Sequence, residues 1–509
     1  MTATAIARLT APALQAFQQA LEQPEQTQSI ILQNIILHNR DTVFGKEHSF
    51  TDIHNPCDFA RAVPIRQYTD FADAINQTAA GKTHLLTTEN ACQFEETGGS
   101  TSGAKLIPYT PSLLMAFRQG VHAWLGDLAK TRPKAFSGNL YFVISPAARS
   151  TECTSGGIPI GCGDDLQYLG ADLAKILQTQ TLYQPELTTA QSATEWHIRT
   201  AILLAKQENL SLISAWSPTL LLQLLHCLHQ QQDKILPQIH DKNRRQTVAR
   251  ALAASVPDTR LLWSRLDTVS CWDSHTATAP AEQLRQLLPH VHLQGKGLLA
   301  TEGIATIPFS GCFLPALTSH YLELVDENEN LIPLTEWQAG QRYRLILTTQ
   351  GGLYRYDTQD WLLATPSPYA RVPNLCFVGR GNLYSDLCGE KLHEAFVAHA
   401  LSQITENIDN KLGNLFVQGV QLPLPHYVLW ADERAVLPNH LAQNLDTALC
   451  ANPQYAYARQ IEQLGVLKVC RLPDVVAYAT RFAKNRVLGI QKLPLLLPVI
   501  NQMETQNDK

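Results

Sequence analysis

The stretch Thr97–Lys105, which reads TGGSTSGAK, combines residue types that bind phosphate groups. Glycine lets the backbone come close to a ligand, hydroxyl and N–H groups donate to phosphate oxygens, and a lysine neutralises negative charge. The spacing differs from the Walker A loop, G-x-x-x-x-G-K-[ST], because Gly103 is followed by Ala104 and Lys105 by Leu106. By itself, the stretch predicts either a phosphate-binding loop or a flexible Gly/Ser loop without a ligand.

Other catalytic patterns do not occur in the sequence. It contains no G-x-S-x-G nucleophile elbow, no H-E-x-x-H zinc motif and no Cys/His spacing typical of a metal site. The 11 cysteines include no C-x-x-C pair, and an odd number cannot all pair within one chain. These observations argue against a serine hydrolase, a zinc protein and a disulfide-stapled scaffold.

Length and composition describe a globular protein. The chain has 509 residues, of which 45% are hydrophobic and 17% charged, with a formal net charge of −5. At about 100–200 residues per domain, this predicts two to four domains, and no basic field favours nucleic acid or an anionic membrane as a partner. The longest apolar runs, Leu220–Leu225 and Leu493–Ile500, are too short for a membrane helix, and no signal peptide is recognisable. We expect a soluble, cytoplasmic protein with free thiols, and the oligomeric state stays open.

The elements that must position the loop alternate between helices and short strands. Apolar periodicity predicts helices over 5–38, 112–128, 166–180, 188–207 and 217–236. Runs of β-favouring residues predict strands at Cys92–Glu95, Leu140–Ser145, Tyr343–Thr349 and Asn374–Gly379. Helices mixed with short apolar strands are typical of an α/β fold.

A domain boundary is predicted near residue 380. There a strand gives way to the polar stretch GRGNLYSDLCGE, residues 379–390, and a helical pattern follows. The rest of the chain alternates strands such as His426–Trp430 with helices such as Ala442–Cys450. We therefore expect a large N-terminal α/β domain over residues 1–380 and a small, mobile α+β lid domain over residues 381–509.

Further motifs follow the loop in the order known from adenylate-forming enzymes. The loop resembles their signature [ST][ST]G[ST][ST]GxPK, with departures at Gly98, Ser102 and Ala104. LLATEG, Leu298–Gly303, resembles their aromatic-x-x-Thr-Glu element, and YDTQD, Tyr356–Asp360, resembles their Tyr-x-Thr-Gly-Asp element. Together, these similarities favour a phosphate-binding loop.

Two further similarities lie toward the C-terminus. Gly379–Arg380 and Gly389 resemble the hinge motif of the same superfamily, with its ten-residue spacing. Lys492, within GIQK, lies where these enzymes carry a catalytic lysine, although the surrounding pattern is shorter here.

Six segments are similar to one branch of that superfamily: FGKEHSF (44–50), VPIRQY (63–68), GGSTSGAKLIPYT (98–110), SAWSPTLLLQLL (214–225), QGKGLLATEG (294–303) and GGLYRYDTQD (351–360). On these, the chain resembles the auxin-responsive promoter family of acyl-acid amido synthetases, the Gretchen Hagen family. The resemblance extends over about residues 40–495 and is loosest in the C-terminal domain. It implies the adenylate-forming, firefly luciferase-like fold.

The resemblance also implies a reaction in two halves. A carboxylate attacks the α-phosphorus of ATP and gives an acyl-adenylate and pyrophosphate, and the amine of an amino acid then takes the acyl group and releases AMP. The substrates would be a small carboxylic acid and an amino acid, and the cofactors ATP and Mg²⁺. The close alternative is an acid–thiol ligase that passes the same adenylate to coenzyme A, and a more distant one is a non-catalytic nucleotide binder.

The loop residues would bind the phosphates of ATP. By the resemblance, Ser100, Thr101 and Ser102 would hold the β- and γ-phosphates, and Lys105 would add a positive charge. The alternative for Lys105 is a solvated loop lysine without a role.

Four residues in the two following motifs would complete the nucleotide site. The resemblance implies that Thr301 lies beside the α-phosphate, that Glu302 helps to bind Mg²⁺, and that Asp360 accepts hydrogen bonds from the ribose hydroxyls. Tyr356 is expected to pack as a wall rather than to react. Alternatives are a buried structural role for Glu302 and a turn role for Asp360.

The last group of candidate residues lies at the boundary and beyond. Arg380 would lie near the ribose and Asn382 near the pivot between the domains. Lys391, in GEKLHE, resembles part of an Asp-Lys pair near the nucleotide, with Glu390 in place of the aspartate. Lys492 would stabilise charge that develops at the α-phosphate.

No motif identifies the residues that bind the acid. The helices at 112–128 and 217–230 are candidate walls, with Trp216, Phe309 and Tyr321 as candidate aromatic residues. His320 could orient a substrate, but a structural role is the better prediction.

Overall fold

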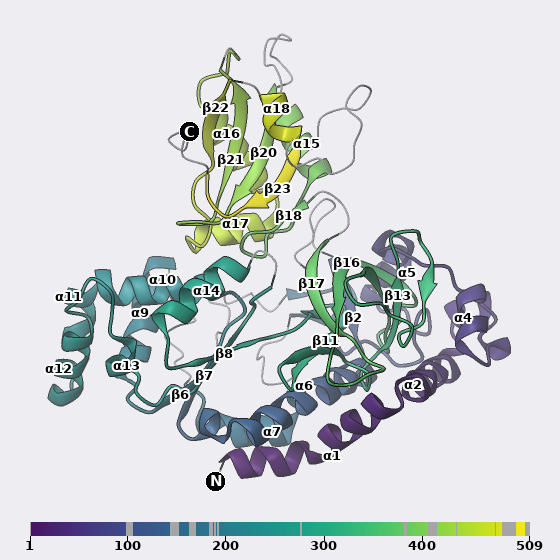
Figure 1. The fold of residues 1–509 in the computed structure, drawn as a ribbon. Coiled ribbons are helices and arrows are strands. Elements are labelled where there is room, and N and C mark those ends of the chain that lie inside the picture. Colours follow the sequence, from purple (N-terminus) through teal and green to yellow (C-terminus); the bar gives the residue numbers. More distant parts are fainter. Residues whose placement is uncertain are drawn as a thin grey trace.

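The computed structural model describes residues 2–97, 105–142, 152–161, 169–182, 187, 190, 193–274, 277–380, 384–405, 415–433, 435–473, 475–480 and 495–503. A larger body contains the elements up to β17, and a smaller body, which begins at β18, stands on it (Figure 1). Within these ranges, no helix has the length and apolar character needed to cross a membrane.

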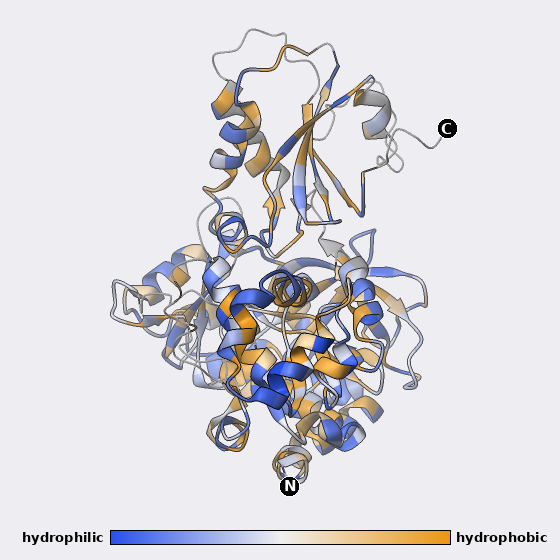
Figure 2. Cartoon of the chain, turned by 90° about the vertical axis from the view of Figure 1, so that its left-hand side faces the viewer, coloured by the Kyte–Doolittle hydropathy of each residue, from blue (hydrophilic) through white to orange (hydrophobic). Residues whose placement is uncertain are grey.

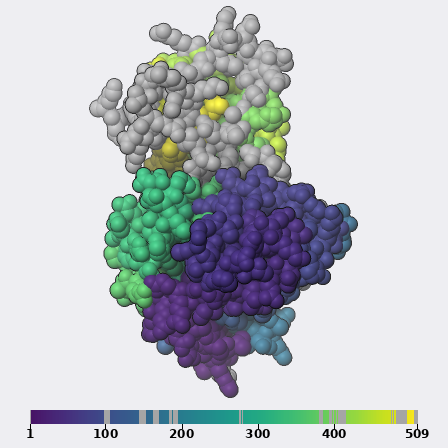
Figure 3. All heavy atoms as spheres, turned by 90° about the vertical axis from the view of Figure 1, so that its right-hand side faces the viewer, coloured from purple at the N-terminus to yellow at the C-terminus, as the bar shows by residue number. Residues whose placement is uncertain are grey.

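The chain starts with two helices, α1 (Thr2–Glu22) and α2 (Pro24–Asn39). One helical stretch was expected here, but it divides at Pro24, because proline at the first position of a helix has no N–H to continue the preceding one. Helix α1 packs along α6 (Pro111–Thr131), and its buried residues include Ile6, Leu14, Phe17 and Leu21. The first hundred residues, coloured purple to dark blue, cover one face of the larger body (Figure 3).

A small sheet in the order β2-β1-β5-β4 carries the predicted phosphate loop. Its strands are β1 (Gln93–Thr97), β2 (Lys105–Tyr109), β4 (Glu152–Cys153) and β5 (Pro159–Ile160). Short helices precede it: α3 (Val43–Glu47), α4 (Pro56–Ala62) and α5 (Ala72–Ala79).

A parallel sheet in the order β3-β6-β7-β8 forms the second layer. Its strands are β3 (Asn139–Phe142), β6 (Leu210–Ser214), β7 (Thr268–Cys271) and β8 (His292–Gly295). The helices of this region are α7 (Ala171–Gln178), α9 (Ala193–Lys206), α10 (Pro218–Gln230), α11 (Gln232–Ile235), α12 (Lys242–Ala251), α13 (Thr259–Leu262) and α14 (Thr278–Leu287). Because the strands are parallel, their carboxyl ends meet at one edge, where open α/β sheets bind ligands.

An antiparallel sheet in the order β14-β13-β15-β16-β17 completes the larger body. Its strands are β13 (Tyr321–Val325), β14 (Leu331–Ile332), β15 (Arg342–Thr348), β16 (Tyr356–Thr365) and β17 (Asn374–Arg380). Two hairpins link it to the parallel sheet: β9 (Leu299–Ala300) with β10 (Gly303–Ile304), and β11 (Thr306–Phe309) with β12 (Cys312–Pro315).

The smaller body is an α+β structure around the sheet β22-β21-β20-β23. Its elements are β18 (Tyr384–Ser385), β19 (Leu392–His393), α15 (Glu394–Thr405), β20 (Leu415–Val420), β21 (His426–Asp432), α16 (Leu441–Leu449), α17 (Pro453–Gln460), β22 (Lys468–Leu472), α18 (Val475–Thr480) and β23 (Leu496–Ile500). Hydrophobic residues run along these strands (Figure 2). Its two apolar clusters are built from residues 387–503. A domain division near residue 380 stays a prediction.

Candidate active site

The predicted phosphate loop connects the two strands of a β-hairpin. Strand β1 ends at Thr97, which pairs with Lys105 at the start of β2, so residues 98–104 link the strands at this end. Ser100, Thr101 and Ser102 lie outside the described residues, and their contact with phosphates stays a prediction. At the other end of β2, the Thr110 hydroxyl caps α6 by accepting from the Leu113 N–H.

Lys105 begins a strand and packs on an aromatic ring. Its Nζ lies 5.3 Å from the ring centre of Tyr68, a distance at which an ammonium is attracted to the ring face. The Tyr68 hydroxyl donates to the Leu106 carbonyl at 3.1 Å and accepts from the Leu106 N–H at 3.0 Å. The start of β2, and with it the base of the phosphate loop, is therefore tied to Tyr68.

Thr301 and Glu302 form the tight turn between β9 and β10. The Tyr109 hydroxyl, at the end of β2, donates to the Thr301 carbonyl at 2.6 Å. The Tyr356 hydroxyl, at the start of β16, donates to Glu302 Oε1 at 3.2 Å. Glu302 is 5% exposed, and its charge adds to the effect of burial in raising the pKa of Tyr68. The three tyrosines thus bring the hairpin, the turn and β16 together.

The glycines before β16 let this strand lie against the hairpin. A Cβ on Gly351 would lie 2.7 Å from Leu113 Cδ2 and 3.0 Å from the Pro108 carbonyl oxygen. Gly352 has a φ of +92°, and a Cβ there would lie 2.6 Å from Leu86 Cβ. The GG pair is therefore needed for close approach, which explains one segment of the family resemblance.

Two other segments of that resemblance fix the start of β16. Arg66 bonds through its backbone to Arg355 at 2.9 Å and to Asp357 at 2.8 Å. The Phe44 ring stacks on the Tyr354 ring with centres 4.5 Å apart. These two segments therefore do not belong to the site itself. They fix the position of the strand that carries YDTQD.

A buried ion pair adds to this support. Arg355, with a φ of +50°, places its guanidinium 3.0 Å from Glu323 Oε2 and donates to the carbonyls of Ala60 and Val63. Burial raises the pKa of Glu323, and the charge of Arg355 opposes that shift. The pair joins β13, α4 and β16 beneath the site.

Asp360 lies in a distorted part of β16. Gln359 has a φ of +61°, the Asp360 N–H donates to Thr358 Oγ1 at 3.1 Å, and the pairing with β17 shifts register after Trp361. This register places Asp360 directly opposite Arg380. Asp360 is 5% exposed and belongs to a strand, so the turn that was the alternative for YDTQD is present only as a local irregularity within β16.

Lys391 lies in the smaller body, in the turn between β18 and β19, with a φ of +47°. The preceding Glu390 is fully buried, accepts from the N–H groups of Leu387 and Cys388, and bonds to the Tyr427 hydroxyl. These contacts anchor the turn within the smaller body. The roles of Lys391 at the nucleotide and of Arg380 at the ribose stay predictions; Asn382 and Lys492 lie outside the described residues.

We expect the stability of the smaller body to fall as pH rises from about 4.5 to 7. Burial first, and then the charge of Asp386, raise the pKa of Glu390 to about 7. The folded state therefore binds this proton more tightly than the unfolded state, and its stabilising effect, complete below about pH 4.5, is lost through pH 7. The loss is on the order of 3 kcal/mol. Hydrogen exchange of the 384–503 peptides across this pH range measures it.

Glu390→Gln should flatten this pH dependence. The matched control is Glu433→Gln, which removes an exposed carboxyl group of the same body and should leave the slope unchanged. An identical slope in wild type and Glu390→Gln would contradict the assignment.

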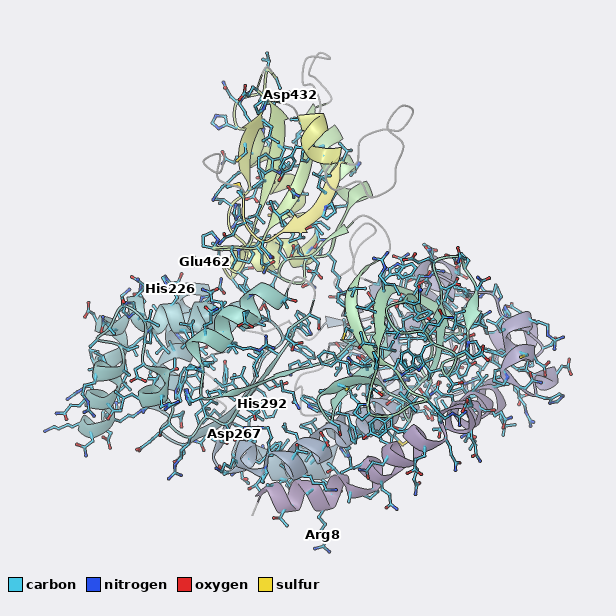
Figure 4. The ribbon with its side chains drawn as sticks, viewed as in Figure 1. Arg8, His226, Asp267, His292, Asp432 and Glu462 are labelled. Carbon is cyan, nitrogen blue, oxygen red and sulfur yellow. The ribbon has the colours of Figure 1, made fainter. Side chains whose placement is uncertain are left out.

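The two bodies meet at Glu462. The Gln223 side chain of α10 donates to the Glu462 carbonyl at 2.6 Å, and the Thr194 hydroxyl of α9 lies 3.4 Å from Glu462 Oε1. Glu462 lies at the lower edge of the smaller body, above His226 of α10 (Figure 4). Both contacts are polar, and the mobility of the smaller body as a lid stays a prediction.

The aromatic candidates for acid binding separate into two groups. Phe309 and Tyr321 are buried in the core, where their rings contact Phe17 and Phe59. Trp216 is 43% exposed at the carboxyl edge of the parallel sheet. Only Trp216 therefore remains a candidate to meet a substrate.

His320 lies in the core, and the structural role expected for it stays a prediction. It is buried and bonds through Nδ1 to Gln350 Oε1 at 2.8 Å, and burial lowers its pKa to about 4. At neutral pH the ring is therefore uncharged.

Lys296, which directly follows β8 and is 5% exposed, was not among the residues predicted from the sequence. The signal in the sequence was a lysine between two glycines, within the segment QGKGLLATEG. It could not be interpreted without the strand order, which decides what lies beside it.

Comparison with known protein families gives matches over most of the larger body. The model of the GH3 family N-terminal domain matches residues 13–293, and that of the GH3 family central domain matches residues 313–380. The first of these alone covers more than half of the chain.

Two curated proteins show sequence similarity over limited segments. The probable indole-3-acetic acid-amido synthetase GH3.11 of Oryza sativa subsp. japonica is 30% identical over 154 residues, 28% of this chain and 26% of that protein. The indole-3-acetic acid-amido synthetase GH3.3 of Arabidopsis thaliana is 30% identical over 118 residues, which are 23% of this chain and 18% of that protein. The matched segments thus span about a quarter or less of these relatives.

Two solved structures share the fold over nearly the whole chain. The acyl acid amido synthetase AtGH3.15 in complex with 2,4-DB has a TM-score of 0.60 at 18% identity, covering 95% of this chain and 94% of that one. The 2-hydroxyisobutyryl-CoA ligase in the thioesterification state has a TM-score of 0.57 at 13% identity, and the match covers 95% of this chain and 90% of that one. The predicted adenylate-forming α/β fold is therefore confirmed. Through its N-terminal and central domains, the chain belongs to the GH3 family.

Proposed function

We propose that this chain is an ATP-dependent acyl-acid amido synthetase. Membership of the GH3 family supports this, as do the names of its curated relatives. The observation that carries the proposal is the meeting of three motifs: the tyrosine hydroxyls at positions 109 and 356 join the loop-bearing hairpin, the Thr301–Glu302 turn and the YDTQD strand. About 250 residues of sequence separate the loop from YDTQD, and a shared phosphate-binding site would explain why the fold brings them together.

In the proposed first step, a carboxylate oxygen of the acid attacks the α-phosphorus of ATP, and pyrophosphate leaves. A free carboxylate is a poor acyl donor, and the adenylate provides AMP as a good leaving group. Thr301 would orient the α-phosphate, and Asp360 would hold the ribose hydroxyls opposite Arg380. In the second step, the amine attacks the acyl carbon, an amide forms, and AMP leaves with one oxygen of the acid. The protein contributes mainly positioning and charge stabilisation.

The phosphates would be bound at the end of the β1–β2 hairpin. Ser100, Thr101 and Ser102 would donate to the β- and γ-phosphates, and Lys105, held over Tyr68, would supply positive charge. Lys492 and Lys391 would act from the smaller body once it closes over the nucleotide. The proposed roles of these two lysines rest on the family resemblance.

A magnesium ion fits the residues at this place. Mg²⁺ is commonly held by one or two carboxylates together with substrate phosphates, and Glu302 is a buried carboxylate at the turn. Among the described residues, no group of three or more His, Cys, Asp or Glu side chains forms a self-sufficient metal site. When bound, the ion would neutralise charge on the phosphates.

We also propose a cytoplasmic location, which the ten free cysteines of the described residues support.

A product screen tests the proposed function. Purified protein with Mg²⁺ and ATP meets a pool of aryl and aliphatic acids, with amino acids in one tube and coenzyme A in the other, and mass spectrometry identifies the products. We expect an acid-dependent amide with an equal amount of AMP in the first tube. AMP and a thioester only with coenzyme A would assign the chain to the thiol ligases instead. AMP in neither tube would favour a non-catalytic nucleotide binder.

A further inference from the structure

A lysine is buried at the carboxyl edge of the parallel sheet. Lys296 is 5% exposed, and its Nζ donates to Oγ of Ser214, the last residue of β6, at 2.8 Å. The ammonium lies 5.1 Å from a ring centre of Trp124 and 5.1 Å from one of Trp216. Lysine is rarely buried in protein interiors, so its position at this edge of the sheet asks for an explanation.

The backbone on both sides of Lys296 requires glycine. A Cβ on Gly295 would lie 2.3 Å from Phe313 Cζ and 2.4 Å from Asp273 Oδ1. Gly297 has a φ of +71°, and a Cβ there would lie 2.6 Å from the carbonyl oxygen of Thr306. The GKG segment is therefore tightly packed, and the position of the lysine is fixed by the fold.

The surroundings of Lys296 reach solvent through Trp216, which is 43% exposed. Its ring lies 5.9 Å from that of Trp272, which follows β7. Ser214, Trp216, Trp272 and Lys296 all stand at the carboxyl ends of parallel strands, the edge at which open α/β sheets bind ligands.

The position of Lys296 relative to the nucleotide motifs follows from helix α6. Near the start of this helix, Tyr109 contacts the Thr301 carbonyl and stacks on Phe117 at 5.7 Å. Trp124, which contacts Lys296, is seven residues further along, or roughly 10 Å at 1.5 Å per residue. Thr301 and Lys296 are thus linked to two points of α6 that lie roughly 10 Å apart, and an acid that reaches from one to the other would have about this length.

We propose that Lys296 determines which acids are used, by binding a hydrogen-bond acceptor at the end of the acid remote from the reacting carboxylate. The preferred acids would carry a second carboxylate, a carbonyl or a hydroxyl oxygen about 8–10 Å from the first carboxylate. The exposed indole ring of Trp216 would pack on the apolar middle of the molecule. This inference rests on the proposed function, since it concerns the acid of that reaction.

Pairs of acids of equal length test the inference: suberate against octanoate, and 4-hydroxycinnamate against cinnamate. AMP formation is measured with wild type, Lys296→Met and Lys296→Arg. We expect wild type to prefer the member with the distal acceptor. Lys296→Met should raise the KM for that acid about tenfold or more, to the level of its plain partner, and leave the KM for ATP unchanged. Lys296→Arg, which keeps the charge, should recover part of the preference.

The matched control is Lys134→Met, an exposed lysine in the 3-10 helix η3 (Pro133–Phe136) before β3, at the opposite edge of the sheet. It should behave as wild type. If Lys296→Met keeps the preference, or if it changes the KM for ATP or for the amino acid instead, the inference is wrong while the proposed function stands. If wild type forms no AMP with any acid, the proposed function fails first and this inference fails with it.

Discussion

Glu302→Gln is expected to lower kcat/KM for acid-dependent AMP formation by about a hundredfold or more. The amide keeps the size of the carboxylate and an oxygen that can accept from the Tyr356 hydroxyl, now 3.2 Å from Oε1. It removes the negative charge that is proposed to hold Mg²⁺ at the phosphates, and such charge stabilisation is commonly worth several kcal/mol in the transition state. AMP release under saturating acid and varied Mg²⁺ measures the effect, and the variant should need much more Mg²⁺ than wild type.

Tyr356→Phe is the matched control for this experiment. It deletes the hydrogen bond to Glu302 and keeps the carboxylate, so we expect a loss of less than about tenfold. Both variants should retain a wild-type melting temperature within a few degrees. A Glu302→Gln variant with a third or more of wild-type activity at low Mg²⁺ would rule out the proposed role of this carboxylate.

Glu323→Gln is expected to destabilise the larger body by about 3–5 kcal/mol. The substitution leaves the buried Arg355 guanidinium, now 3.0 Å from Glu323 Oε2, without its countercharge, and breaking a buried pair from one side has a cost of this size. Since Arg355 precedes β16, activity should fall along with stability. Urea unfolding followed by tryptophan fluorescence gives the free energy of unfolding.

Arg342 and Glu327 provide the matched comparison. They form an ion pair of 2.8 Å in which both side chains are more than half exposed. Solvent screens such a pair, so Glu327→Gln should change stability by less than about 1 kcal/mol. Replacing both members of the buried pair, as Glu323→Leu with Arg355→Met, should recover part of the loss. Equal effects of Glu323→Gln and Glu327→Gln would show that burial of the first pair has no energetic importance.

The sequence predicted the parts of the site that depend on local pattern. The strand before the loop, the helix that follows the hairpin and the strands β15 and β17 were expected from the pattern of apolar and β-favouring residues, and the structure has them within a few residues. Local pattern failed where one residue outweighed the periodicity. Pro24 divides the first helical stretch. At YDTQD no strand was predicted, and the structure has the strand β16 there with a positive φ at Gln359.

Contacts between distant segments could not be predicted from the sequence. The opposition of Asp360 and Arg380 depends on the register of two strands, including a shift after Trp361. The bonds from Tyr109 to Thr301 and from Tyr356 to Glu302 need three sheets to meet. Tyrosine is common in cores, and nothing in its local sequence shows that its hydroxyl reaches a distant carbonyl or carboxylate.

The family resemblance provided what local pattern could not. It selected Glu302 from the 45 acidic residues of the chain and predicted a role for it before any contact was known. It did not select Lys296, because the role proposed for this lysine concerns the choice of acid. That role became visible only when β6 and β8 placed Ser214, Trp216 and the lysine side by side.

Isotope transfer from the acid to AMP tests the central claim most directly. An acid that is a substrate is labelled with ¹⁸O in its carboxylate and incubated with the protein, ATP, Mg²⁺ and the amino acid. The masses of the products are then measured by mass spectrometry. The proposed mechanism predicts that one labelled oxygen appears in AMP, since the carboxylate attacks the α-phosphorus and the amine then displaces AMP. Unlabelled AMP, or label in inorganic phosphate together with ADP, would contradict an acyl-adenylate intermediate.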